Sequence, residues 1–550
     1  AHLTLVFQQY NVIDFSELTL AALRALGTSE QPTDLALYLD DRITHLLVDE
    51  FQDTSITQYE LLQRLTYDWY DGDGRTVFFV GDPMQSIYRF RNAEVTLFMQ
   101  AQTHGFGQLS LTPLQLTMNF RSKQGVVNWV NQTFAEIFPE TVDLTYGGVP
   151  LSPAASSDQS TDNCIHYYNG LVSDTATQGE RVAQTILSLR QHQPNTSIAI
   201  LVRSRNHLRD ILPYLSRYNI PIHATDIDPL DSQAEIIDAL TLCRALLSQN
   251  DRIAWLALLR SPMCGLSLED CFTLSQTAPH QTLWQRCLDD RLVESLSKHA
   301  QKIIARIRPS LILSNNQTGR VPFSHRFKFT WLALGGAQCL ASQQALAHCE
   351  TLFDVIVKIE QQEGRVEWPT IEEEIARLYA EPQAHSEQAI NIMTIHKSKG
   401  LEFDHVLLPH LESGSTSANV ELLKWQEYID QQQQPGLAMA PIKASHDTDD
   451  PIYTSLGRFD KRKTQFEKQR LLYVAVTRAK QSLHLFASCD QDNQEIIKPP
   501  RSNSMLQLLW QTHQTAFEKM LQWNLRHAIR SHMVWKQKIQ VTQTKHFEVS

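Results

Sequence analysis

A strand-length apolar run that breaks directly into two acids constrains this chain more than any other stretch. Residues 46–48 (LLV) precede Asp49 and Glu50. In open α/β sheets, ligands bind at the carboxyl ends of the strands, so two acids there favour a site for a metal ion and water. One carboxylate can hold Mg²⁺ on a nucleotide's phosphates while its neighbour orients the attacking water. The alternative is a strand end followed by helix-capping residues, a role for which Asp53 is suited.

The composition is that of a soluble globular protein with several domains. The chain has 550 residues, of which 42% are hydrophobic and 20% charged, and single cores rarely grow beyond roughly 250–300 residues. No run reaches the roughly 20 apolar residues of a membrane span. The net charge of −11 argues against a protein that coats nucleic acid and allows only a local binding groove. We expect a reducing, cytoplasmic location, because the eight cysteines are scattered without zinc-ligand spacing.

Short apolar strands alternate with helical segments in both the first and the last parts of the chain, which predicts α/β domains. Strand-like runs occur at residues 46–48, 76–80, 197–202, 390–395, 404–408 and 483–486. From about 233 to 380 the pattern is helical, with helices expected at 234–248, 252–259 and 341–362, which predicts an all-helical insertion. We expect a further helix at 470–480 and a polar, poorly ordered surface stretch at 413–450.

Five short motifs occur in order along the chain. They are residues 49–54 (DEFQDT), 81–88 (GDPMQSIY), 119–122 (NFRS), 394–403 (TIHKSKGLEF) and 472–479 (LYVAVTRA). This series resembles the UvrD/Rep-type superfamily 1 DNA helicases. The similarity is greatest to the beta-subunit branch of exodeoxyribonuclease V and its AddA-like relatives, which residues 259–262 (LRSP) and 331–336 (WLALGG) also resemble.

The resemblance implies an α/β fold with two RecA-like parallel-sheet motor domains, the first of them incomplete, and an all-helical insertion in the second. ATP would lie between the two motor domains, and single-stranded DNA would run across both. The expected boundaries are 1–112 for the first motor domain, 113–232 and 386–490 for the second, 233–385 for the insertion and 491–550 for a helical or loose tail.

The resemblance also assigns catalytic roles. Asp49 would hold Mg²⁺ and Glu50 would act as the general base, because phosphoryl transfer needs charge neutralisation and an in-line nucleophile. Gln85 would lie near the γ-phosphate and couple hydrolysis to DNA movement. Arg121 and Arg478 resemble the two arginines that reach the γ-phosphate from the second motor domain. For an arginine on a helix the usual alternative is a surface salt bridge, and the residues around Arg478 favour the catalytic role.

Other positions in the motifs resemble contacts to the nucleotide or to DNA. Phe120 would stack on adenine, Glu402 would bind the ribose, and Gly400 belongs to the same loop. Stacking on unpaired bases is worth roughly 1–3 kcal/mol per base. The candidates on the DNA side are Tyr88, Phe90, Arg91, His396 and Lys399, although the two aromatic rings could instead belong to the core and the histidine could be structural.

Three positions depart from the family's pattern. Phe120 stands where tyrosine is frequent, Met84 replaces a frequent lysine, and Asn92 replaces a glycine after Arg91. A larger departure is the absence of any G-x-x-x-x-G-K-[ST] phosphate loop in the sequence. In the family that loop lies upstream of the acidic motif, so we expect that the chain is a fragment.

We therefore predict a fragment of an ATP-dependent 3′-to-5′ DNA helicase of recombination or repair, inactive by itself. Its cofactors would be ATP and Mg²⁺. Its partners would be single-stranded and duplex DNA and other subunits of a helicase–nuclease complex. We expect no membrane partner. The alternative is a helicase homologue that naturally lacks the loop and serves as a DNA-binding or scaffolding subunit. We find no D-x-K nuclease constellation after residue 490 and predict no nuclease activity in this chain.

Overall fold

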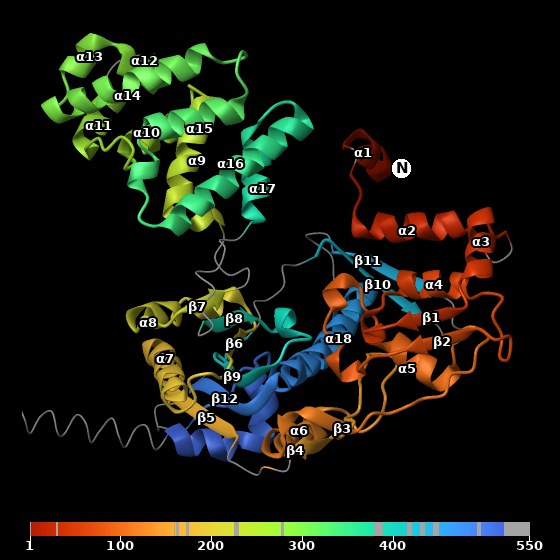
Figure 1. Cartoon of the computed structure of the whole chain (residues 1–550). Coiled ribbons are helices and arrows are strands. Elements are labelled where there is room, and N and C mark those ends of the chain that lie inside the picture. Colours follow the sequence, from red (N-terminus) through yellow and green to blue (C-terminus); the bar gives the residue numbers. More distant parts are fainter. Residues whose placement is uncertain are drawn as a thin grey trace, which may run out of the picture. The chain divides into compact units, whose positions relative to one another are not determined.

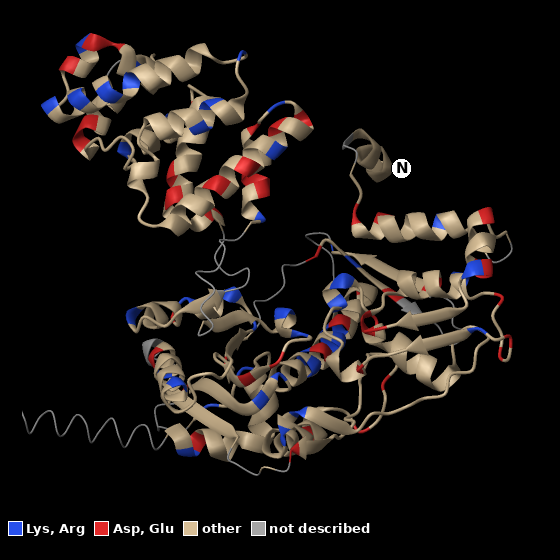
Figure 2. Ribbon diagram, in the orientation of Figure 1, with Lys and Arg blue, Asp and Glu red and all other residues tan. Residues whose placement is uncertain are grey.

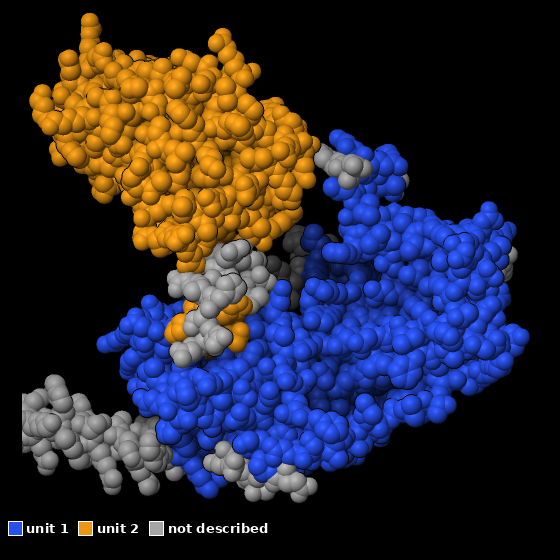
Figure 3. Space-filling model, viewed as in Figure 1, with its two compact units in different colours: residues 1–220, 393–550 blue, residues 221–392 orange. Residues whose placement is uncertain are grey.

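The computed structural model describes thirteen stretches of the chain. They are residues 2–10, 12–28, 31–158, 160, 164–171, 175–224, 230–276, 280–378, 389–414, 421–429, 435–443, 450–491 and 497–521. The chain divides into two compact units, one of residues 1–220 with 393–550 and one of residues 221–392 (Figure 3). The candidate site residues all lie in the first unit.

The first unit begins with helices and a small parallel sheet. Strand β1 (His45–Val48) pairs with β2 (Thr76–Phe79) in register from His45↔Thr76 to Val48↔Phe79 (Figure 1). The surrounding helices are α1 (His2–Tyr10), α2 (Phe15–Leu26), α3 (Asp34–Arg42), α4 (Ile56–Leu65) and α5 (Val95–His104). Single 3₁₀ turns follow the strands, at Phe51–Asp53, Pro83–Gln85 and Arg89–Arg91.

The two faces of the β1–β2 sheet differ. On one face, Phe79 stacks on Phe51 with ring centroids 4.0 Å apart and meets Phe106 edge-on at 4.9 Å. On the other face, Leu47 and Phe78 are partners in the register but remain 72% and 51% exposed. Parallel sheets normally have both faces covered. Among the described residues this small sheet therefore has a bare apolar face.

The larger sheet of the molecule has six strands in the order β5-β12-β9-β6-β8-β7. They are β5 (Ile165–Leu171), β6 (Ile198–Val202), β7 (Ile222–Ala224), β8 (Ile390–Thr394), β9 (Phe403–Leu408) and β12 (Ala479–Cys489). The pairs β5·β12, β12·β9, β9·β6 and β7·β8 are parallel. Every residue of β6 is buried, as expected for a parallel strand covered on both faces.

Helices accompany this sheet, and some of them share an apolar core with it. They are α6 (Gln124–Ile137), α7 (Thr175–His192), α8 (Leu212–Arg217), α18 (Pro451–Val476) and the helical residues 505–521. The core joins side chains of α6, α18 and the sheet to Met84, Ile87 and Val95 from the segment after β2. A short parallel pair, β3 (Met118–Lys123) with β4 (Ala155–Asp158), precedes β5.

The second unit holds the helical insertion around its own apolar core. Its helices are α9 (Ala234–Leu247), α10 (Arg252–Arg260), α11 (Leu268–Gln276), α12 (Leu283–Leu288), α13 (Asp290–Glu294), α14 (Lys298–Asn316), α15 (Phe323–Ala333), α16 (Gln343–Glu363) and α17 (Trp368–Ala376). The predicted α/β fold with parallel sheets and an all-helical insertion is confirmed. The predicted division of the chain at residues 112, 232, 385 and 490 stays a prediction.

Two local predictions are wrong. The helix expected at 470–480 ends at Val476 and β12 starts at Ala479, so Arg478 lies in the turn between them. Part of the stretch expected to be poorly ordered forms an antiparallel hairpin of β10 (Leu423–Ile429) and β11 (Pro435–Pro441), in which apolar side chains alternate along each strand. The run of glutamines at 431–434 and residues 522–550 lie outside the described residues.

None of the described helices combines the length and the apolar character that a membrane span would need.

Candidate functional site

The carboxyl ends of β1 and β2 lie side by side and carry polar side chains. The N–H of Val80 donates to Val48 O at 2.9 Å, which extends the strand pairing by one residue. Asp49 and Glu50 follow β1, and Asp82 follows β2. The acids predicted for a strand end therefore lie at the edge of a parallel sheet where ligands commonly bind.

Gln52 ties these two strand ends together. Its Oε1 accepts a hydrogen bond from the N–H of Asp82 at 3.0 Å, and its carbonyl accepts one from Ser86 Oγ at 3.0 Å. A Cβ on Gly81 would lie 2.1 Å from Gln52 Oε1. The close approach of the two loops therefore requires glycine at this position.

Glu50 has a left-handed backbone conformation, with a φ of 52°. Its N–H donates to Asp49 Oδ1 at 2.8 Å, and its carboxylate accepts a hydrogen bond from Gln52 Nε2. A non-glycine residue in such a conformation costs about 1–3 kcal/mol, and such residues cluster at functional sites.

Lys399, which lies in the segment between β8 and β9, contacts the acids that follow β1. Its ammonium forms an ion pair with Asp53, lies 3.1 Å from Glu50 Oε2 and stands 5.3 Å from the centre of the Tyr88 ring. The side chain is only 6% exposed. Burial raises the pKa of the Asp53 carboxyl, and the contact with Lys399 opposes that rise. The predicted position of Lys399 close to both DNA and nucleotide stays a prediction, and its ion pair with Asp53 was not predicted.

Gln85 connects the loop after β2 to the turn before β12. Its Nε2 donates to Asp82 Oδ2 at 2.8 Å, and its Oε1 accepts a hydrogen bond from Arg478 Nη2 at 3.1 Å. Burial raises the pKa of the Asp82 carboxyl, which the hydrogen bond from Gln85 opposes. The structure thus brings together Gln85 and Arg478, which are far apart in the sequence.

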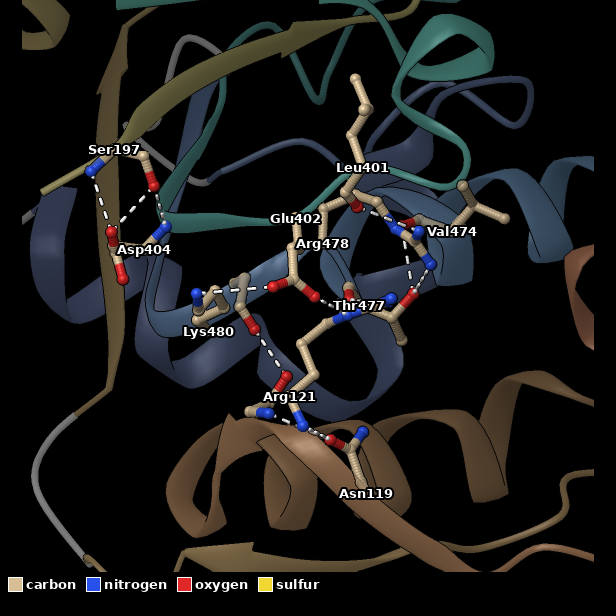
Figure 4. A network of polar contacts seen from close by, with 12 residues as sticks. Asn119, Arg121, Ser197, Leu401, Glu402, Asp404, Val474, Thr477, Arg478 and Lys480 are labelled. Atoms are coloured by element: carbon tan, nitrogen blue, oxygen red, sulfur yellow. Dashed lines mark hydrogen bonds and ion pairs between the residues drawn. The ribbon is translucent and has the colours of Figure 1, made fainter. Parts of the chain in front are cut away.

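Arg478 is buried and held by the end of α18 and the loop before β9 (Figure 4). Its Nε donates to Val474 O at 3.0 Å, its Nη1 to Leu401 O at 3.2 Å and its Nη2 to Thr477 Oγ1 at 3.2 Å. Burial lowers the pKa of the guanidinium to about 10. The group therefore remains charged at neutral pH in a place that excludes water.

Arg121 and Glu402 form the second polar group in Figure 4. Arg121 Nε donates to Glu402 Oε2 at 2.8 Å, and Lys480 Nζ lies 3.4 Å from Glu402 Oε1. The hydrogen bond from Arg121 and the charges of both cations lower the pKa of the Glu402 carboxyl. Lys480 was not predicted as a site residue, although it follows the motif that contains Arg478 directly.

The side chain of Asn119 holds the backbone of β3 on both sides of Arg121. Asn119 Oδ1 accepts hydrogen bonds from the N–H groups of Arg121 and Ser122, at 2.9 and 3.0 Å. Ser122 Oγ donates to Ala479 O at 2.7 Å, which joins β3 to β12. Between them, the ring of Phe120 is 82% exposed and available for stacking.

The candidate DNA residues form a ring cluster. The centroids of Tyr88 and Phe90 are 5.8 Å apart, and Phe90 meets His396 edge-on at 5.5 Å. The Arg91 guanidinium lies 5.3 Å from the Tyr88 ring and 5.5 Å from the Phe90 ring. Phe90 is 65% exposed, so it is not a core residue. The Tyr88 hydroxyl donates to His396 O at 3.3 Å.

Arg203 is a further basic residue near this cluster. It follows the buried strand β6 directly. Burial lowers the pKa of the His396 imidazole, and the positive charge of Arg203 lowers it further. The signal that could have found Arg203 is the one used for Asp49, a polar side chain directly after a buried strand. Gly400, in the loop beside His396, has a φ of 81°.

Two family domains match this chain. Residues 2–105 match the UvrD/REP helicase N-terminal domain, and residues 114–489 match the UvrD-like helicase C-terminal domain. The chain belongs to the UvrD-like helicase family. This agrees with the resemblance that the five ordered motifs indicated.

Three relatives illustrate the similarity. The A subunit of the ATP-dependent helicase/nuclease of Leuconostoc mesenteroides is 27% identical over 579 residues, which cover 96% of this chain and 44% of the relative. The protein of the same name from Exiguobacterium sibiricum is 27% identical and covers 89% and 44%. The exonuclease/helicase protein RexA of Lactococcus lactis is 27% identical and covers 86% and 43%. The chain therefore spans less than half of the length of these relatives.

A magnesium site fits the acids only in combination with a nucleotide. Among the described residues, no group of three or more His, Cys, Asp or Glu side chains could hold a metal ion. Mg²⁺ commonly binds through one or two carboxylates and the phosphates of its substrate. The exposed carboxylate of Asp49 suits that arrangement, in which the phosphates supply the remaining ligands.

Proposed function

We propose that this chain is the larger part of an ATP-dependent helicase motor that moves 3′ to 5′ along single-stranded DNA in recombination or repair. The observation that carries the proposal is the hydrogen bond between Gln85 and Arg478. It joins the loop beside the acids to the turn that holds a buried arginine. A motor of this kind needs such a link between the two halves of its nucleotide site.

The acids and arginines would share the work of hydrolysis. Asp49 would bind Mg²⁺, which neutralises phosphate charge when it is bound, and Glu50 would orient the attacking water and accept its proton. Arg121 and Arg478 would stabilise the charge that develops on the γ-phosphate. Arg121 is held by Glu402 and Arg478 by Gln85, and each would exchange that partner for the phosphate.

The nucleotide base and sugar would bind beside these groups. The exposed ring of Phe120 offers a face for adenine, and Glu402 accepts hydrogen bonds that the ribose hydroxyls can replace. Lys480 would keep Glu402 ionised when Arg121 turns to the phosphates, since it contacts the other carboxylate oxygen.

Single-stranded DNA would stack on the ring cluster of Tyr88, Phe90 and His396. Stacking recognises any base, which suits a motor that must move along every sequence. Arg91 would contact the backbone. The site would be a local groove, consistent with a net charge of −11.

The phosphate-binding loop would come from a segment that is not among residues 1–550. The bare face of the β1–β2 sheet, with Leu47 and Phe78 exposed, supports this because a parallel sheet requires cover on both faces. By itself the chain would then be inactive. The second candidate, a homologue that naturally lacks the loop and serves as a scaffold, is less favoured because Asp49, Glu50, Gln85, Arg121 and Arg478 are all present.

The complete protein would act in the cytoplasm as one component of a helicase–nuclease complex. The names of its relatives, which describe helicase/nuclease and exonuclease/helicase subunits, support this assignment. None of the eight cysteines, all of which lie in described stretches, forms a disulfide, which suits a reducing compartment.

The deciding experiment compares ATP hydrolysis by residues 1–550 with that of the full-length protein, each with and without single-stranded DNA. We expect DNA-stimulated hydrolysis only in the full-length protein, and loss of that hydrolysis in Glu50→Gln. DNA-stimulated hydrolysis by residues 1–550 that Glu50→Gln abolishes would contradict the separate phosphate loop. A full-length protein that binds DNA but hydrolyses no ATP would favour the scaffolding role.

A further inference from the structure

One face of α18 carries a polar stripe that contacts the loop of residues 86–94, which includes the candidate stacking residues Tyr88 and Phe90. The stripe comprises residues spaced three or four apart, which therefore lie on the same side of the helix: Asp460, Lys463, Thr464, Glu467 and Arg470. All five contact residues between Ser86 and Glu94. Charged residues of both signs alternate along this helix (Figure 2).

The exposed part of the stripe holds Arg89. Its N–H donates to Glu467 Oε1 at 3.1 Å, its Nη1 donates to Thr464 Oγ1 at 2.9 Å, and its Nη2 forms an ion pair with Asp460. Arg89 separates the two candidate stacking residues, Tyr88 and Phe90. Arg89 therefore links the part of the loop that carries both rings to α18.

The buried part of the stripe holds the two ends of the loop. Arg470 is 5% exposed and donates from Nε to Ser86 O and from Nη1 to Gly147 O, both at 2.7 Å. Lys463 Nζ lies 2.6 Å from Glu94 Oε2, and both side chains are largely buried. Burial lowers the pKa of Arg470 to about 10, which leaves it charged at neutral pH.

The same helix leads directly to Arg478. It is continuous from Pro451 to Val476, and Val474 O near its end accepts a hydrogen bond from Arg478 Nε at 3.0 Å. The polar stripe thus connects the residue between the DNA-facing rings with the arginine proposed to reach the γ-phosphate. The path is one rigid helix, with defined hydrogen bonds at both ends.

The polar character of the stripe suits it to fix the position of the loop rather than to stabilise the fold. Buried charges are expensive unless they are fully paired, and well-packed apolar residues often stabilise an interface equally well. Fixed hydrogen bonds instead prescribe one arrangement of the loop against the helix. The five polar residues are therefore suited to pass a displacement of this loop to α18.

We propose that α18 transmits the DNA-bound state of residues 86–91 to Arg478, with Glu467 and Arg470 as positioning residues. The inference rests on the proposed function and extends it to residues outside both the nucleotide site and the DNA groove. Stacking of a base on Tyr88 or Phe90 shifts Arg89, Arg89 shifts α18, and α18 turns Arg478 towards the phosphate.

The test uses the full-length protein with the double substitution Asp460→Asn and Thr464→Val, which releases the Arg89 side chain. The Arg89–Asp460 pair is partly exposed, so its loss costs little stability. The matched control is Lys461→Gln, an exposed position on the same helix. For each protein we would measure the affinity for single-stranded DNA, hydrolysis without DNA, hydrolysis with saturating DNA and the melting temperature.

In the double variant we expect unchanged DNA affinity, unchanged hydrolysis without DNA and an unchanged melting temperature. DNA-stimulated kcat should fall about tenfold, within the roughly 5–150-fold range of measured couplings between sites. Arg470→Gln should lower the stimulation further and also lower the melting temperature, because two buried carbonyls lose their donor, and Arg470→Lys should restore part of the stimulation. The control should behave as the wild type.

Three outcomes would overturn the inference. A wild type that DNA stimulates, with a double variant stimulated equally, would overturn it alone and leave the proposed function in place. A wild type without DNA-stimulated hydrolysis would overturn the proposed function and the inference together. A fall in DNA affinity equal to the fall in kcat would also reject it, because the stripe would then serve only to shape the DNA groove.

Discussion

The amide oxygen of Gln85 and the guanidinium of Arg478 are joined by a hydrogen bond of 3.1 Å. Gln85 is also fixed by Asp82, and Arg478 by the end of α18. The hydrogen bond thus joins the loop beside the acids to the turn before β12.

Replacing Arg478 by alanine should abolish hydrolysis in the full-length protein. Arginines of this type are worth roughly 10³–10⁵ in rate. Gln85→Ala removes only a positioning contact. It should lower the rate by about one to two powers of ten, within the range known for misplaced catalytic groups. Steady-state hydrolysis with saturating DNA measures both. Equal losses in the two variants would mean that Gln85 itself contacts the reacting phosphate.

Lys399→Met should destabilise the first unit strongly. Asp53 would remain as a nearly buried carboxylate without its cation, and breaking one partner of a buried pair costs about 3–5 kcal/mol. Urea unfolding of residues 1–550 measures the loss. The double variant Lys399→Met with Asp53→Asn should recover most of it, because no unpaired charge is left. Failure to recover would show that Lys399 stabilises the unit mainly through Glu50 or the Tyr88 ring.

Phe90→Ala should weaken binding to single-stranded DNA by about 1–3 kcal/mol, the contribution of one stacked base. The dependence of the affinity on salt should not change, since that slope reports contacts to phosphates. Fluorescence anisotropy at several salt concentrations measures both quantities. A reduced slope with Phe90→Ala would show that the substitution displaces Arg91 or another cation as well.

Two buried histidines, His405 and His484, and the partly buried His166 should make the large sheet sensitive to acid. His166 on β5 stacks on His484 on β12 at 4.6 Å, and Ser482 Oγ links His484 to His405 on β9 at 2.8 and 2.7 Å. Burial lowers the pKa of all three imidazoles below their ordinary value of 6.5. The unfolded chain therefore binds more protons than the folded chain below about pH 6.5.

The contribution of these histidines to stability is fully present above pH 6.5 and is lost as the pH falls below it. The free energy of unfolding should accordingly decrease between about pH 7.5 and 5.5. His484→Gln should flatten this dependence while lowering stability at neutral pH by a smaller amount. A wild-type stability that does not change over this range would contradict the assignment of neutral imidazoles.

Local composition was sufficient to predict the elements with strong periodicity. The strand Ile198–Val202 is apolar throughout and buried throughout, and the helix predicted at 234–248 is observed at Ala234–Leu247. The end of α18 was misplaced because residues 473–480 contain no proline or glycine to mark the end of a helix. Only the hydrogen bonding of the backbone decides where the helix stops.

The partners of the candidate site residues were harder to predict than the residues. Lys399 and Asp53 are separated by 346 positions, and no local pattern records that they meet. The same is true of Arg89 and Glu467, 378 positions apart. Motifs indicate which side chains carry chemistry, whereas the folded chain decides which of them contact each other.

The uncovered face of the β1–β2 sheet also has a practical consequence for producing this polypeptide. The two short parallel strands expose the apolar side chains of Leu47 and Phe78. Among the described residues, the sheet also has strand edges without a further partner. Exposed apolar patches and open strand edges both promote aggregation. Soluble expression of residues 1–550 will therefore depend on what covers these two side chains. Polar replacements at Leu47 and Phe78 offer a route to a tractable sample without touching a residue of the candidate site.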